Sequence, residues 1–104
     1  MTNYLFVYHG GTQPETPEEI ESVMTAWQSW LQALGSAVID AGNPVGKSVT
    51  VTSDGSVENH GGSNPASGYG IFSAESLDAA IEIARQCPIL TAGGTVELAD
   101  IFDV

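Results

Sequence analysis

Basic side chains are nearly absent from this sequence. Lysine and arginine together number 2, against 13 aspartates and glutamates, which gives a formal net charge of −11. Binding DNA, RNA or an anionic membrane would bring like charges together, and the chain has no basic patch with which to displace counterions. We therefore expect neither nucleic acid nor a membrane as a partner.

Long apolar runs and cysteine pairs are also missing. No stretch approaches the roughly 18 consecutive apolar residues that a membrane span needs, and Met1 to Tyr4 carry no basic or apolar leader. The single Cys87 cannot form an intramolecular disulfide, so we interpret it as a small core residue. For a length of 104 residues, these features predict one cytoplasmic domain spanning residues 1–104.

Cofactor and metal motifs are absent as well. The Gly61-Gly62 pair lacks the lysine and the strand–loop–helix context of a phosphate-binding loop. Neither His9 nor His60 belongs to a histidine–carboxylate pattern with metal-ligand spacing. We expect no cofactor and no metal.

The first third of the chain predicts a strand followed by an amphipathic helix. Residues Tyr4 to His9 are aromatic, apolar or β-branched at nearly every position, which is typical of a strand buried on both faces. Thr16-Pro17-Glu18-Glu19 then combines a capping threonine, a proline suited to the first helical position and a capping-box glutamate. Apolar residues follow at helical spacing, and Gly35 ends the helix. These apolar positions are Ile20, Val23, Met24, Trp27, Trp30, Leu31 and Leu34.

The middle of the chain predicts a short strand and a hairpin. Ala37 to Ala41 has the composition of a strand, and Gly42-Asn43-Pro44 closes it with a turn. Ser48 to Thr52 is β-branched and leads into Asp54-Gly55, a dipeptide favoured in tight hairpins. Asn59 to Ser67 has no periodicity and is typical of a loop.

The last third predicts a strand, a second helix and a final strand. Tyr69 to Phe72 is a short apolar run, after which Ser73 or Ser76 can cap a helix that Pro88 stops. Thr95 to Phe102 alternates between apolar and polar residues, as a half-buried strand does, with Val96, Leu98 and Phe102 on one face and Asp100 interrupting that face. The apolar face of the helix consists of Leu77, Ala80, Ile81 and Ala84.

This order of elements predicts an α+β fold of the ferredoxin-like type. It matches a split βαβ plan with an inserted hairpin, in which an antiparallel sheet carries two helices on one face. The first strand is apolar on both sides, so the other face of the sheet would expose a large hydrophobic patch, which soluble monomers rarely do. We therefore expect a homodimer packed sheet to sheet.

The sequence resembles the YCII-related family of the DGPF type, which belongs to the dimeric α+β barrel superfamily. The resemblance covers nearly the whole chain. It rests on the strand Tyr4-Leu5-Phe6-Val7-Tyr8, the helix with Trp27 and Trp30, Gly42-Asn43-Pro44, Asp54-Gly55, Ser67-Gly68-Tyr69, the alanine-rich second helix ending at Pro88, and Gly93-Gly94-Thr95-Val96-Glu97.

The resemblance implies a ferredoxin-like fold, a homodimer and a cleft lined by the sheet and the first helix. Some relatives carry a histidine in the first helix that forms an acid–base pair with a carboxylate. The matching stretch here, around Thr25 and Ala26, has no histidine, and the Asp-Gly-Pro-Phe signature is replaced by His60-Gly61-Gly62-Ser63-Asn64-Pro65. The resemblance therefore transfers no catalytic residue to this chain.

Three ionisable residues in apolar strands are candidates for acid–base chemistry. His9 ends the first strand just before two glycines that would let the backbone pass close to a ligand, and its imidazole can exchange a proton near neutral pH. Asp40 and Asp100 interrupt apolar strands, so either could orient His9. For all three residues, a structural role at a strand edge is the alternative interpretation.

Four further residues are candidates for ligand binding. Trp27 and Trp30 lie three apart on the first helix and could line a pocket, with Tyr69 adding a hydroxyl group, although two core tryptophans are the commoner outcome. His60 could close over a cleft from its glycine-rich loop or remain solvated.

These candidates lead to three hypotheses for function. The first is a small-molecule binding or sensing homodimer with an apolar cleft between the sheet and the first helix. The alternative is a cofactor-free isomerase, lyase or hydrolase that uses His9 with Asp40 or Asp100 as an acid–base pair. The third is a protein-interaction module whose acidic surface docks a basic partner.

Overall fold

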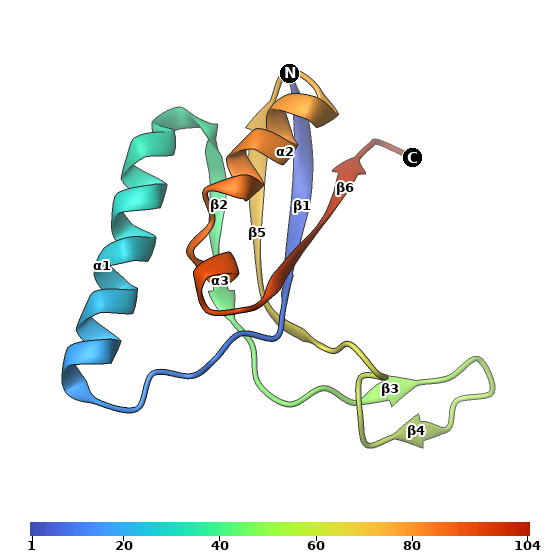
Figure 1. The fold of residues 1–104 in the computed structure, drawn as a ribbon. Helices are drawn as coiled ribbons and strands as arrows, with labels where there is room; N and C mark the ends of the chain where they lie inside the picture. The colour runs from blue at the N-terminus through green and yellow to red at the C-terminus, as the bar shows by residue number, and fades with distance from the viewer.

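A computed structural model describes all of residues 1–104 and contains one larger sheet, one small hairpin and several helices (Figure 1). The chain forms these elements in the order expected for a split βαβ fold with an inserted hairpin. They are β1 (Thr2–His9), α1 (Pro17–Leu34), the 3-10 turn η1 (Gly35–Ala37), β2 (Val38–Pro44), β3 (Thr50–Val51), β4 (Val57–Glu58), β5 (Ala66–Ala74), α2 (Leu77–Arg85), α3 (Pro88–Thr91) and β6 (Thr95–Ile101). None of the helices is both long and apolar enough to cross a membrane.

The larger sheet has four strands in the order β2-β5-β1-β6, and every neighbouring pair is antiparallel. The helices lie on one side of this sheet (Figure 1). The ferredoxin-like α+β fold predicted from the sequence is confirmed. The short helix α3 and the turn η1 are additions that the sequence pattern did not predict.

Alternate residues of β1 fill the space between the sheet and the helices. Tyr4, Phe6 and Tyr8 are 5%, 0% and 4% exposed, and the ring centroid of Phe6 lies 4.6 Å from that of Phe72 on β5. Trp30 completes this aromatic cluster and donates a hydrogen bond from its Nε1 to the carbonyl oxygen of Ile83 at 3.3 Å. The core is therefore built on one face of the central strand.

Cys87 lies in this core, as the sequence predicted. It is 2% exposed, and burial raises the pKa of its thiol to about 11. Burial also raises the pKa of the neighbouring Tyr8 hydroxyl. Both groups therefore remain protonated at neutral pH and belong to the packed interior.

Helix α1 begins at the capping box that the sequence predicted. Thr16 Oγ1 accepts a hydrogen bond from the backbone nitrogen of Glu19 at 3.1 Å, and Glu19 Oε2 accepts one from the backbone nitrogen of Thr16 at 3.4 Å. Only the C-terminal half of the apolar stripe packs on the core; Ile20, Val23 and Met24 remain exposed. The apolar face predicted for α1 is thus longer than the part of the helix that packs on the core.

The β3–β4 hairpin projects away from the sheet as an arm (Figure 1). Asp54 holds its tip, because its Oδ1 accepts hydrogen bonds from Thr52 Oγ1 at 2.5 Å and from the backbone nitrogen of Ser56 at 2.9 Å. These bonds keep the pKa of Asp54 well below its usual range. Three valines of the arm, Val49, Val51 and Val57, are exposed. The arm helps to explain a radius of gyration of 15.0 Å, against about 13 Å for a compact chain of this length.

The opposite side of the sheet, called the open face below, carries no helix. Its central residues are only partly buried and lie outside the aromatic core. It consists of Asn3, Leu5, Val7 and His9 of β1, Tyr69, Ile71 and Ser73 of β5, and Thr95, Glu97, Ala99 and Ile101 of β6. The predicted apolar second face of the first strand is therefore present and uncovered in the single chain.

Strand β2 bends where Gly42 meets β5. Gly42 has a φ of 74°, and a Cβ atom built on it would lie 1.6 Å from the carbonyl oxygen of Tyr69. Asp40 stabilises this bend, because its Oδ1 accepts a hydrogen bond from the backbone nitrogen of Gly42 at 2.8 Å. Only glycine fits at position 42.

We expect Gly42→Ala to lower the free energy of unfolding by at least about 2 kcal/mol, since the new methyl group would displace the β5 backbone. Urea denaturation measures this change directly. Gly46→Ala is the matched control, because a Cβ atom at position 46 meets nothing within 4 Å; it should change stability by less than about 0.5 kcal/mol. Equal effects of the two substitutions would contradict the explanation.

Candidate functional site

Two rows of side chains cross the open face from β6 to β2. Glu97, Val7, Tyr69 and Asn43 stand opposite one another in one row. The next row contains Ala99, Leu5, Ile71 and Asp40. The middle of the face is therefore a partly exposed apolar strip, and carboxylate, phenol and amide groups border it.

His9 lies at one end of this face and is 8% exposed. Its Nε2 lies 2.9 Å from Oε1 of Glu97 on β6, and its Nδ1 lies 3.2 Å from the carbonyl oxygen of Pro65, just before β5. The imidazole therefore links three segments of the chain: the end of β1, the strand β6 and the loop that enters β5.

The sheet register explains why a glutamate reaches His9. His9 stands opposite Thr95, and Glu97 lies two residues further along β6 on the same face. Such diagonal neighbours are roughly 7–8 Å apart at the backbone, which suits the length of a glutamate side chain.

The hydrogen-bond partners of His9 determine its charge. The Pro65 carbonyl and the Glu97 carboxylate are both acceptors, so only the imidazolium, with a proton on each ring nitrogen, can satisfy both. The hydrogen bond to Glu97 raises the pKa of His9, and the carbonyl groups of Pro65 and Asn64 act in the same direction. Burial of the ring opposes this shift without reversing it.

Two glycine pairs, Gly10-Gly11 and Gly93-Gly94, lie near His9, and they allow backbone segments to approach each other closely. Gly10 and Gly11 have φ angles of 71° and 94°, and a Cβ atom on Gly94 would lie 2.6 Å from the carbonyl oxygen of His9. We expected the glycines after His9 to make room for a ligand. Instead, they let the end of β1 and the start of β6 pass close to each other.

The structure does not bring His9 together with either aspartate. Asp100 stands opposite Tyr4, so it belongs to the helix-covered side of the sheet, whereas His9 belongs to the open face. Asp40 stands opposite Ile71 and binds the backbone of Gly42, which places it about 13 Å from His9 along the strand direction. The expected pairing with Asp40 or Asp100 is therefore absent, and Glu97 takes that position.

The expected aromatic cleft is also divided between the two faces. The ring centroid of Trp27 lies 5.2 Å from that of Tyr8 and 5.6 Å from that of Trp30, so both tryptophans fill the space between α1 and the sheet. Tyr69 stands opposite Val7 on the open face. A cleft lined jointly by Trp27, Trp30 and Tyr69 does not form in the single chain.

His60 lies on the hairpin arm and is exposed. Its Nδ1 accepts a hydrogen bond from the backbone nitrogen of Gly62 at 3.0 Å, and its Nε2 lies 3.4 Å from Oε2 of Glu58. With Lys47 and Pro65 it borders a small hollow of about 200 Å³ at the base of the arm. No group of three or more His, Cys, Asp or Glu side chains lies close enough together to hold a metal ion.

The pairing of His9 with Glu97 predicts a pH-dependent contribution to stability. The pKa of His9 is higher in the folded protein than its ordinary 6.5, so folding favours the protonated ring. This stabilisation is complete below pH 6.5 and is lost as the pH rises through the folded-state pKa. We expect Glu97→Gln to cost about 1 kcal/mol at pH 6, a modest figure because Glu97 is largely exposed, and clearly less at pH 9.

Urea titrations at both pH values check this expectation. Glu58→Gln is the matched control, because it removes the same charge from the exposed pair with His60 and should have little effect at either pH. A Glu97→Gln cost that grows with pH would contradict the assignment of His9 as an imidazolium.

Comparisons with known proteins place this fold in a family. The family model of the YCII-related domain matches residues 4–104. A solved structure with a similar fold is the 5-chloro-2-hydroxyhydroquinone dehydrochlorinase TftG from Burkholderia phenoliruptrix AC1100, in complex with 2,5-dihydroxybenzoquinone. It is 20% identical, the TM-score is 0.53, and the alignment covers 91% of this chain and 90% of that chain. No curated protein matches the sequence significantly. Because the family model spans nearly the whole chain, the protein belongs to the YCII-related family.

Proposed function

We propose that the protein binds a small organic molecule on its open face, as a homodimer in which a second copy covers that face. One observation carries this proposal: an uncovered apolar strip through Val7 and Leu5 lies directly beside the buried His9 and its partner Glu97. An apolar surface with a few converging polar groups is the usual composition of a ligand site.

The proposed ligand position differs from the cleft expected between the sheet and α1. That space is filled by Trp27 and Trp30, whereas Tyr69, Glu97 and His9 share the open face. The ligand would lie on the strip, bordered by the Tyr69 hydroxyl and the Glu97 carboxylate. The net charge of −11 favours neutral or cationic molecules over anions.

Three apolar surfaces without partners support the homodimer. They are the strip on the open face, the exposed apolar side chains near the start of α1, and the valines of the hairpin arm. A two-stranded hairpin is only marginally stable when it packs on nothing. A symmetric dimer would bury such surfaces on both copies at once.

The similar dehydrochlorinase gives further support for a small ligand. It was solved with 2,5-dihydroxybenzoquinone, a flat ring with two hydroxyl groups. A flat ring has the shape that would fit a strip between two packed sheets, so planar ring compounds are the first candidates for this protein.

A cofactor-free isomerase, lyase or hydrolase is the second candidate function. The observation that favours it is the hydrogen-bonded pair of His9 and Glu97 at the edge of the strip. A histidine paired with a carboxylate can move protons near neutral pH without a cofactor. In this form of the proposal, Glu97 replaces Asp40 or Asp100 as the carboxylate of the acid–base pair.

We expect light scattering coupled to size exclusion to give the mass of a dimer for the wild-type protein at micromolar concentration. Val7→Glu places a charge on the strip and should produce a folded monomer, because burying it between two copies is costly. Leu77→Glu at the exposed start of α2, outside the three apolar surfaces, is the control for added charge and should remain dimeric. A monomeric wild type would refute this part of the proposal.

We expect at least one neutral planar ring compound in a thermal-shift screen to raise the melting temperature by several degrees, since a ligand at 100 times its Kd stabilises by about 2.7 kcal/mol. Tyr69→Ala should abolish this shift because it removes a border of the strip. His60→Ala, on the arm, should preserve it. The reverse result would place the site on the arm.

A further inference from the structure

The hydrogen bonds at both ring nitrogens of His9 limit its role in acid–base chemistry. Both ring nitrogens face acceptors, Nδ1 the Pro65 carbonyl at 3.2 Å and Nε2 Glu97 Oε1 at 2.9 Å, an arrangement that only the doubly protonated ring satisfies. An imidazolium has no free lone pair, so it cannot accept a proton. His9 therefore does not act as a general base while these two bonds persist.

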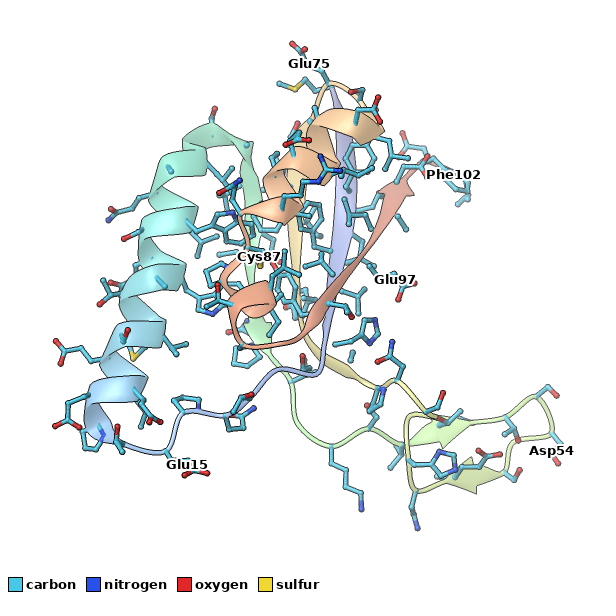
Figure 2. All side chains as sticks on the ribbon, in the orientation of Figure 1. Glu15, Asp54, Glu75, Cys87, Glu97 and Phe102 are labelled. Carbon is cyan, nitrogen blue, oxygen red and sulfur yellow. The ribbon has the colours of Figure 1, made fainter.

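Glu97, unlike His9, has an atom that is free to accept a proton. His9 holds its Oε1, no hydrogen-bond donor contacts its Oε2, and its side chain is 66% exposed. Figure 2 shows Glu97 standing off β6 on the side away from α3. Glu97 stands opposite Val7, so its unoccupied oxygen is available to a molecule that lies on the strip.

We infer that Glu97 is the proton acceptor of the site and that His9 is a positioning residue, an imidazolium that holds the carboxylate in place. This inference rests on the proposed binding of a small molecule to the open face. It predicts a substrate with a weakly acidic C–H or O–H bond, neutral overall, whose proton is transferred to Glu97. The sequence had assigned the base role to His9.

The charged groups around His9 and Glu97 agree with Glu97 as the base and His9 as the positioning residue. Along β6, Thr95 and Ala99 are uncharged, and the loop that enters β5 presents only Asn64 and Pro65 to the ring. The basic side chains of Lys47 and His60 border the hollow next to Pro65. Tyr69, beside Val7, and Asp40, at the far edge of the next row, are the other ionisable groups on the open face. A single carboxylate therefore balances the imidazolium.

The probe 5-nitrobenzisoxazole tests the inference without knowledge of the natural substrate. It is flat and neutral, and it requires only a base. The base removes the C–H proton, the electron pair of that bond forms a nitrile, and the N–O bond breaks to release 2-cyano-4-nitrophenolate, which absorbs visible light. A positioned general base contributes about 100-fold or more over the same group in solution.

We expect the wild-type protein to exceed acetate by about 100-fold in second-order rate constant at pH 7. Glu97→Gln should lose this advantage, and Glu58→Gln should retain it. His9→Asn should lower the rate between about 10- and 100-fold, because the carboxylate is no longer held in place. Melting temperatures of all variants verify that they are folded.

The pH profile separates a positioning role from a base role for His9. If Glu97 is the base, the rate reaches its plateau below the pKa of His9 and falls when His9 loses its proton. If His9 is the base, the rate rises through that same pKa. A rise, an unchanged Glu97→Gln variant, or a wild type no better than acetate would each overturn the inference.

Long-range ¹H–¹⁵N NMR of the imidazole provides a readout that needs no ligand. At pH 7, His9 should show two protonated ring nitrogens in the wild type, and its titration should move to lower pH in Glu97→Gln. A neutral His9 at pH 7 would overturn the assignment. The oligomeric state and the thermal-shift screen test the proposed binding itself. Its failure can therefore be distinguished from failure of the role inferred for Glu97.

Discussion

Strand β1 pairs with a strand on each edge and is apolar on each face, and these two conditions determine the remaining architecture. Tyr4, Phe6 and Tyr8 alternate toward the helices and form the core. Leu5 and Val7 alternate toward the open face, where no element of the same chain covers them. A central strand with two apolar faces needs a layer on each side, and one copy of the chain supplies only one layer. The site and the proposed dimer thus originate in the same strand.

The position of the candidate pair depends on close contact between backbone segments. Gly94 approaches the carbonyl of His9 more closely than a side chain would allow, and left-handed Gly10 and Gly11 turn the chain away immediately after β1. This contact sets the register that places Thr95 opposite His9 and Glu97 on the diagonal. The glycine pairs in the sequence therefore act on the chemistry indirectly, by aligning two strands whose residues then meet.

Local signals in the sequence were sufficient for the order of the main helices and strands and insufficient for the pair of His9 and Glu97. The turn expected at Gly42-Asn43-Pro44 is instead the end of β2. The capping box at Thr16 and the strand at Tyr4 to His9 depend on neighbouring residues, and both were predicted correctly. The partner of His9 depends on the register between β1 and β6, which lie at opposite ends of the chain. Alternation on β6 was interpreted from Val96 and Leu98, which left Glu97 on the side assumed to face water. The same alternation placed Asp100 with the apolar residues, and the register confirms that it shares their helix-covered side.

Covering the open face would change the chemistry of Glu97 as well as the stability of the protein. A carboxylate in water is a weak base because water solvates its charge, and removal of that water raises its affinity for a proton. His9 holds the carboxylate of Glu97 through a charge-assisted hydrogen bond. The two effects are distinct: the hydrogen bond from His9 positions Glu97 before reaction, and exclusion of water would favour proton transfer once a molecule fills the strip. The pair of His9 and Glu97 borders an uncovered face in one copy of the chain. It would thus become reactive when a second copy covers that face.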